Sequence, residues 1–164
     1  DGLPIHSVRI GPYVGSSVTV VGGNGYFGHF GNRVAAVDLK AGTVSWQTED
    51  TGFPYLSSAA TDGSALFIGS RNRKVVGMRL TDGAELWSFE ALAKVDGSPV
   101  VYGDGVLVGA NDGRLYELEK TNGTLSWSYD LGAPISTTAA VVGTWIYVGT
   151  HDGVLYALEG GARR

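Results

Sequence analysis

The 164-residue chain contains no cysteine, which excludes disulfide bridges, zinc sites built on thiolates and catalysis by a thiol. It has only five prolines against 26 glycines, a balance that suits many tight turns better than disorder. No apolar run approaches the roughly 18 residues that a membrane-spanning helix needs, so we expect no membrane span. Acidic residues outnumber basic ones by 16 to 12, and this balance argues against a nucleic-acid partner, which favours a basic surface.

What the sequence does contain is an internal repeat. Trp46, Trp87 and Trp127 close three similar segments and lie 41 and 40 residues apart. A fourth copy opens at Leu155 and reaches Arg164 before its tryptophan position. A period of about 40 residues with several short strands in each unit is typical of propeller blades.

Each repeat predicts four antiparallel strands. A strand of small residues comes first, as at 57–60, and an apolar strand follows, as at 66–68. Asn-Asp-Gly or His-Asp-Gly then predicts a tight hairpin, and an alternating strand such as 115–118 leads through a Thr-Asn-Gly turn to the strand that carries the tryptophan. We therefore expect an all-β propeller of four-stranded antiparallel blades, with small residues near the axis and the tryptophans filling the wedges between diverging blades.

The repeats fall at about 16–56, 57–97, 98–137 and 138–164, the last completed by 1–15, within a single domain 1–164. On this alignment Leu3-Pro-Ile-His6 is a leftover fourth strand. It predicts closure by pairing with the last repeat, because closure removes the exposed edges of a sheet protein. Three arrangements remain open: a small propeller closed by this N-terminal strand, half of an eight-bladed propeller, or a piece of a longer repeat array.

The segment from Ala36 to Trp46 resembles the tryptophan-docking motif of pyrroloquinoline-quinone-like (PQQ-like) propeller repeats. The resemblance puts glycines at the turn and tryptophans at the docking position: Gly42 with Trp46, Gly83 with Trp87, and Gly123 with Trp127. Gly77 and Glu117 depart from it where the motif has alanine. That family contains quinone-dependent dehydrogenases, non-enzymatic scaffolds and bacterial sensor domains, which implies a periplasmic or extracellular location.

Strand alternation predicts that the loops after the fourth strands and those between second and third strands share one face. In related propellers that face holds the cofactor or partner. Arginine beside aromatic residues is typical of protein-binding hot spots, although a charged run such as 70–74 is also typical of a solvated turn. The candidate binding residues on this loop face are His29, Arg33, Phe53, Tyr55, Arg71, Arg73, Lys74, Arg114 and His151.

Trp145 breaks the repeat, since Ala65 and Gly105 occupy the equivalent positions. We expect it to fill a wedge beside the last blade; an exposed indole here would instead indicate an interface.

Catalytic signatures are weak. The Asp-Gly pairs lack the spacing of a calcium loop and are better interpreted as turns. Neither a nucleophile elbow nor a phosphate loop occurs in the sequence. We therefore expect a non-enzymatic interaction scaffold or sensor with no metal and no cofactor. Its partner would be another protein or a second copy of the chain, with a homodimer forming an eight-bladed ring. The alternative is part of a quinone- and calcium-dependent dehydrogenase.

Overall fold

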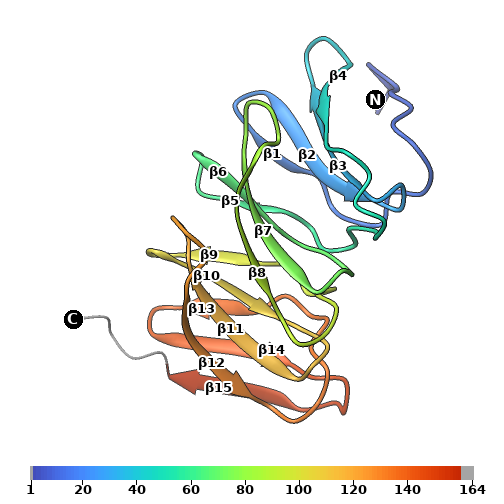
Figure 1. Cartoon of the computed structure of the whole chain (residues 1–164). Coiled ribbons are helices and arrows are strands. Elements are labelled where there is room, and N and C mark those ends of the chain that lie inside the picture. Colours follow the sequence, from blue (N-terminus) through green and yellow to red (C-terminus); the bar gives the residue numbers. More distant parts are fainter. Residues whose placement is uncertain (1, 160–164) are drawn as a thin grey trace.

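The computed structural model describes residues 2–159, which form four antiparallel sheets and no helix (Figure 1). Each sheet is called a blade here and is numbered in chain order. Blades 1 to 3 have four strands and blade 4 has three, as the sequence predicted. Blade 1 consists of β1 (Thr19–Val21), β2 (Asn24–His29), β3 (Arg33–Asp38) and β4 (Thr43–Gln47), and blade 2 of β5 (Ala60–Thr61), β6 (Ala65–Gly69), β7 (Lys74–Arg79) and β8 (Glu85–Glu90). Blade 3 consists of β9 (Val100–Tyr102), β10 (Gly105–Gly109), β11 (Arg114–Glu119) and β12 (Leu125–Asp130), and blade 4 of β13 (Ala140–Val142), β14 (Trp145–Gly149) and β15 (Leu155–Glu159).

The third and fourth strands pair in the same register in each complete blade. Ala36, Gly77 and Glu117 lie opposite Trp46, Trp87 and Trp127, and each ladder is interrupted by a bulge immediately afterwards. Gly123, in the turn between β11 and β12, has a φ of +72°, a backbone conformation that side chains with a Cβ rarely adopt. The repeat seen in the sequence is therefore a repeat of backbone geometry.

The inner strands begin two or three residues later than the small-residue segments predicted. The backbone N–H groups of Ser17 and Ser58 donate across blades, to the hydroxyls of Ser58 and Ser98, at 2.9 Å in both cases. These residues therefore link neighbouring blades before the ladder with the second strand starts.

Apolar side chains fill the three seams between consecutive blades. Phe67 and Val75 of blade 2 pack with Val108 and Leu118 of blade 3. Trp87 is buried in this seam, where its ring stacks on that of Phe67 with centroids 5.7 Å apart. The equivalent clusters lie between blades 1 and 2 and between blades 3 and 4. The core is thus divided into layers between the sheets, as wedge-filling tryptophans predicted.

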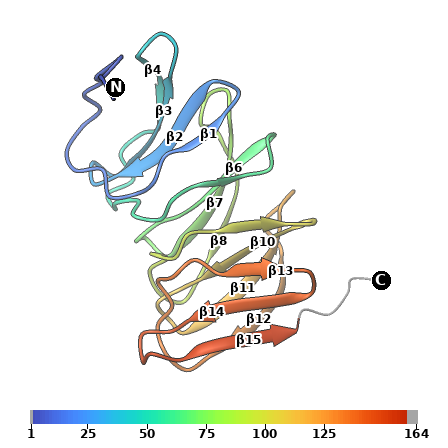
Figure 2. The same ribbon diagram turned by 180° about the vertical axis from the view of Figure 1, so that it is seen from behind.

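The expected closure by residues 3–6 does not form in this structure. These residues adopt no strand, and the ring of His6 lies against the turn between β3 and β4, where its Nε2 is 3.0 Å from the carbonyl oxygen of Lys40. The N-terminal segment and β15 lie at opposite ends of the stack of sheets in both views (Figures 1 and 2). In this structure residues 3–6 and β15 therefore do not pair.

Nothing in residues 2–159 forms a helix that is long and apolar enough to cross a membrane.

Candidate functional site

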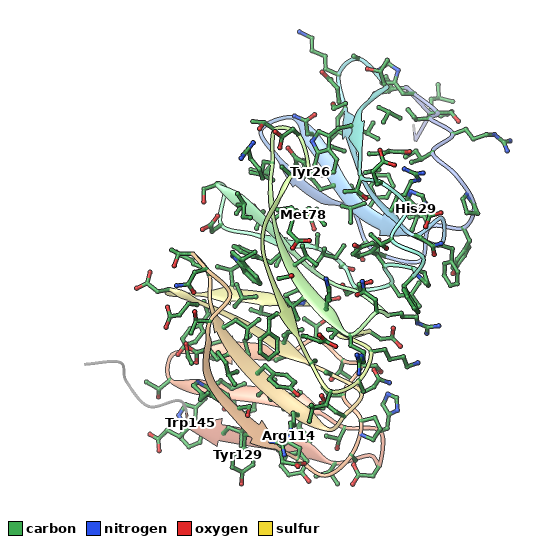
Figure 3. The ribbon with its side chains drawn as sticks, in the orientation of Figure 1. Tyr26, His29, Met78, Arg114, Tyr129 and Trp145 are labelled. Atoms are coloured by element: carbon green, nitrogen blue, oxygen red, sulfur yellow. The ribbon has the colours of Figure 1, made fainter. Side chains whose placement is uncertain are left out.

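The loop face is formed by the turns between second and third strands together with the connections that join one blade to the next. Backbone hydrogen bonds hold these two sets of loops together. Arg71 donates to the carbonyl oxygen of Pro54 at 3.2 Å, and Asn111 donates to that of Lys94 at 3.0 Å. His151 donates in the same way to Pro134 at 2.9 Å. His29 and Arg114 mark this side of the stack in Figure 3.

Two of the candidate binding residues are buried and support the fold instead. His29 is covered by Gly11 and Gly31, and its Nδ1 accepts a hydrogen bond from the N–H of Gly31 at 3.0 Å. Burial and the nearby charge of Arg33 lower the pKa of the His29 imidazole. Tyr55 packs behind Gly28, and burial raises the pKa of its hydroxyl. The sequence interpretation placed both on the surface because they lie next to loops, and this was wrong.

The basic residues of the loop face are mostly paired with acidic ones. Arg71 forms a two-pronged contact with Asp96, at 2.9 and 3.2 Å, and Lys94 contacts the same carboxylate at 3.0 Å. Burial raises the pKa of Asp96, but the hydrogen bonds from Arg71 and Lys94 outweigh it and hold this pKa below its usual value. The loop face over blades 2 and 3 is therefore a network of both charges.

The remaining arginines contact groups on their own blades. Arg73 pairs with Glu90 at 2.5 Å, and Arg114 pairs with Asp130 at 3.0 Å. Arg33 donates to the carbonyl oxygen of Thr48 at 2.5 Å. The acidic partners of the arginines were not identified from the sequence, although each lies at the end of a fourth strand or in the connection after it. Lys74, the remaining basic candidate, is half-buried at the start of β7.

Several apolar and aromatic side chains on the loop face reach solvent. Phe53 is exposed, as expected, and His151 is exposed with its Nε2 2.6 Å from the Ser136 hydroxyl. The sequence interpretation missed Tyr13 and Phe30, whose rings meet edge to face with centroids 5.1 Å apart. The sequence could have indicated Phe30, because it stands in a turn where the other repeats have the polar residues Arg71, Asn111 and His151.

Four of the Asp-Gly pairs, at 82, 104, 112 and 152, lie in turns, as the sequence interpretation expected, whereas Asp96-Gly97 lies in the connection between blades 2 and 3. Asp112 is an example: its carboxylate accepts hydrogen bonds from the N–H groups of Leu92 and Arg114 and from the hydroxyl of Tyr116. Burial and this carboxylate raise the pKa of Tyr116. Among residues 2–159, no group of three or more histidine, aspartate or glutamate side chains could hold a metal ion.

The tryptophans contact the following blade on the opposite side of the stack. Trp46 and Trp87 lie against Gly83 and Gly123 and donate from Nε1 to backbone carbonyl oxygens at 2.9 Å. Trp127 instead donates to the buried carboxylate of Glu117. Beside Trp46 a cleft of about 370 Å³ opens between blades 1 and 2, lined by Asn24, Tyr26, Asp38, Ser45, Trp46, Leu80 and Thr81.

One face of blade 4 exposes apolar side chains, and for Tyr147 and Leu155 the equivalent residues of the other three blades are all buried. Val142, Trp145, Tyr147 and Leu155 are all exposed there. Trp145 lies at the end of β14 away from the loop face (Figure 3). The expectation that it fills a wedge is wrong for this structure, because no blade within residues 2–159 lies against this face to form one. The interface alternative fits the observed exposure.

Comparison with known proteins places this geometry in a family. The family model described as outer membrane protein assembly factor BamB matches residues 30–164. No curated protein matches the chain significantly in sequence.

Solved structures resemble the chain in fold. The structure of BamB from Moraxella catarrhalis shares 20% identity with a TM-score of 0.80, and the match covers 92% of this chain and 51% of that one. The chain thus spans about half the length of that relative. The computationally designed Ika4 protein shares 14% identity with a TM-score of 0.85, covering 98% of this chain and 100% of that one. Quinohemoprotein alcohol dehydrogenase from Comamonas testosteroni shares 15% identity with a TM-score of 0.74, covering 84% of this chain and 29% of that one.

Proposed function

The chain belongs to the PQQ-like repeat family whose model is described as outer membrane protein assembly factor BamB, and from that premise we propose that it is a non-catalytic interaction scaffold of the bacterial cell envelope. Its loop face binds a protein partner, and a second copy of the chain completes the scaffold. The accessible part of the loop face consists of Phe53, Arg73, Arg114 and His151, with the aromatic pair of Tyr13 and Phe30.

The construction of the loop face is the observation that carries this proposal. Hydrogen bonds between backbones hold its loops in place, so an incoming protein meets a surface that is already ordered. Exposed aromatic rings supply contact area. Arg73 and Arg114 each pair with a carboxylate of this chain, and a carboxylate of the partner can replace that one or bind beside it. These features suit recognition of a protein surface with mixed charge.

Site-specific photocrosslinking in cells of the source organism tests this function. A photoreactive phenylalanine analogue replaces Phe53, which is 49% exposed. The control replaces Leu125, which is 43% exposed but begins β12, at the end of the blade opposite to the loop face. We expect one envelope protein to crosslink at position 53 and not at 125. Charge reversal of Arg73 and Arg114 should weaken that product. Equal crosslinking at both positions, or none at 53, contradicts a role for the loop face.

The dehydrogenase alternative has fold-level likeness alone in its favour. Calorimetric titration of the chain with pyrroloquinoline quinone and calcium tests it directly. Saturable quinone binding with one defined stoichiometry would support a cofactor site and overturn the non-catalytic assignment.

A further inference from the structure

The three filled seams share one feature that blade 4 lacks. In each, a glycine at the end of a second strand receives a side chain from the connection to the next blade. A Cβ on Gly28, Gly69 or Gly109 would lie 2.3, 2.5 and 2.1 Å from side-chain carbons of Tyr55, Val95 and Ile135 respectively. A Cβ on Gly149 would meet only Thr137, at 3.8 Å. We call the space over each of these glycines a socket. The socket at Gly149 is therefore equivalent to the other three but has no side chain in it.

The side chain that matches this socket stands at the start of the chain. Tyr55, Val95 and Ile135 each precede the glycine of their own repeat by 14 residues, and Val14 precedes Gly28 by the same 14. Its three equivalents are buried in seams, whereas Val14 is exposed. Val14, beside blade 1, is thus a side chain of the kind that fills a socket, and Gly149 of blade 4 provides an unfilled one.

The N-terminal segment is also held as the outer strand of a preceding blade would be. His6 lies on Gly42 as Trp46 lies on Gly83. Val8 and Ile10 pack on the outer face of blade 1, against Phe27, Ala35 and Val37. In the same way, Phe89 and Ala91 at the end of β8 pack on blade 3. Residues 3–9 therefore occupy the place of a fourth strand on blade 1, and among the described residues β15 pairs with β14 alone.

We propose that two copies of this chain complete each other, with residues 3–9 of one copy adding to β15 of the other and Val14 entering the socket at Gly149. The arrangement continues a seam already repeated three times within the chain. Because each copy carries both halves, a two-fold axis satisfies both ends at once and leaves no free sheet edge. The inference rests on the proposed function in one respect, that a second copy of the chain completes the scaffold. It does not depend on what the loop face binds.

The register of the exchanged strand follows from blades 2 and 3. Lys74 lies opposite Glu90 there, and Arg114 lies opposite Asp130. The equivalent pair across two copies is Val154 opposite Arg9 of the other copy. Residues directly opposite in an antiparallel pair have Cα atoms about 4.5–5.5 Å apart, within the range that a disulfide spans.

The double variant Arg9→Cys/Val154→Cys tests the proposal, because the chain has no other cysteine. After mild oxidation, non-reducing electrophoresis should show a covalent two-chain species, and either single variant should not form it efficiently. A disulfide within one chain would mean self-closure and overturn the proposal. A ladder of larger species would mean an open filament, and no disulfide would mean no exchange; either result also overturns it.

Two further variants separate the seam from general folding. Gly149→Ala puts a methyl group into the socket and should reduce two-chain crosslinking about tenfold or more, because overpacking is destabilising, while the chain stays folded by circular dichroism. Leu155→Thr should also reduce it, whereas Leu92→Thr should not; the two leucines are matched at 72% and 70% exposure, but Leu92 lies in the connection from blade 2 to blade 3. Equal crosslinking in all three variants contradicts the proposed seam. Loss of loop-face crosslinking at position 53 would leave these results unchanged.

Discussion

The seam between blades 2 and 3 and the open face of blade 4 are built from equivalent positions with different surroundings. Phe67 is fully buried, whereas Tyr147, two residues before the glycine of its own repeat in the same way, is 37% exposed. Val75 is buried and its equivalent Leu155 is exposed. Both faces carry an aromatic and an aliphatic side chain, so they differ in what covers them and not in chemistry. An apolar sheet face of this kind is typical of an interaction site.

The largest expected effect comes from truncating the aromatic residue on each face. Phe67→Ala should lower the free energy of unfolding by about 3–5 kcal/mol, because it leaves a cavity beside Trp87 in a filled seam. Tyr147→Ala should cost under about 1 kcal/mol in the separated chain, because its ring is partly in water. Urea unfolding followed by fluorescence at low protein concentration measures both. Equal losses of unfolding free energy in the two variants would mean that Tyr147 is as well covered as Phe67 in the separated chain, and would contradict an open face on blade 4.

Adding a methyl group instead of removing a ring sharpens the same comparison. Gly109→Ala forces a Cβ against Ile135 and should cost about 1–3 kcal/mol through overpacking. Gly149→Ala meets no close neighbour and should stabilise the separated chain by about 0.5 kcal/mol, since alanine loses less conformational entropy than glycine in a strand. Thermal unfolding of both variants checks the opposite signs.

Acidification should weaken blade 1 before the other blades. The pKa of His29 is lowered in the folded chain by burial and by Arg33, so its contribution to stability is complete above its unfolded pKa of about 6.5 and is lost as the pH falls through that value toward the folded one. His29→Gln should flatten the dependence of unfolding free energy on pH below the unfolded pKa of about 6.5. His151→Gln, on an exposed residue, is the control, and an unchanged slope in His29→Gln would contradict this assignment.

The smallest effect is expected at Arg73. It has a φ of +70°, where the equivalent residues of blades 3 and 4 are Gly113 and Gly153. Arg73→Gly relieves about 1 kcal/mol of backbone strain and loses an exposed ion pair with Glu90 worth about 0.2–1 kcal/mol. Stability should therefore change by less than about 1 kcal/mol, while photocrosslinking of the partner at position 53 falls. Urea unfolding and crosslinking of the same preparation separate the two effects.

The sequence predicted the blades well because the repeat constrains them strongly. Glycine turns and paired tryptophans recur at a fixed spacing, and the same bulge follows at each repeat. Single side chains in loops were harder to place. His29 and Tyr55 are next to turns in sequence, yet Gly11 and Gly28 let other segments approach closely enough to bury them. Those contacts join residues more than 15 positions apart, and no local pattern reports them.

The ends of the chain were also beyond local patterns. The sequence indicated that residues 3–6 are a fourth strand, but whether they close their own ring depends on how far four blades curve. That curvature arises from side-chain packing in three seams. In this structure this segment stays on blade 1 without forming a strand, and β15 keeps a free edge within the part of the chain that is described.

Sedimentation equilibrium of the 164-residue chain at micromolar concentration tests the central claim most directly. If blade 4 presents an unfilled seam that blade 1 of a second copy completes, the mass should be twice 17.1 kDa and should fall to a single 17.1 kDa in Gly149→Ala. A wild-type chain that stays at 17.1 kDa over the whole concentration range would contradict the account.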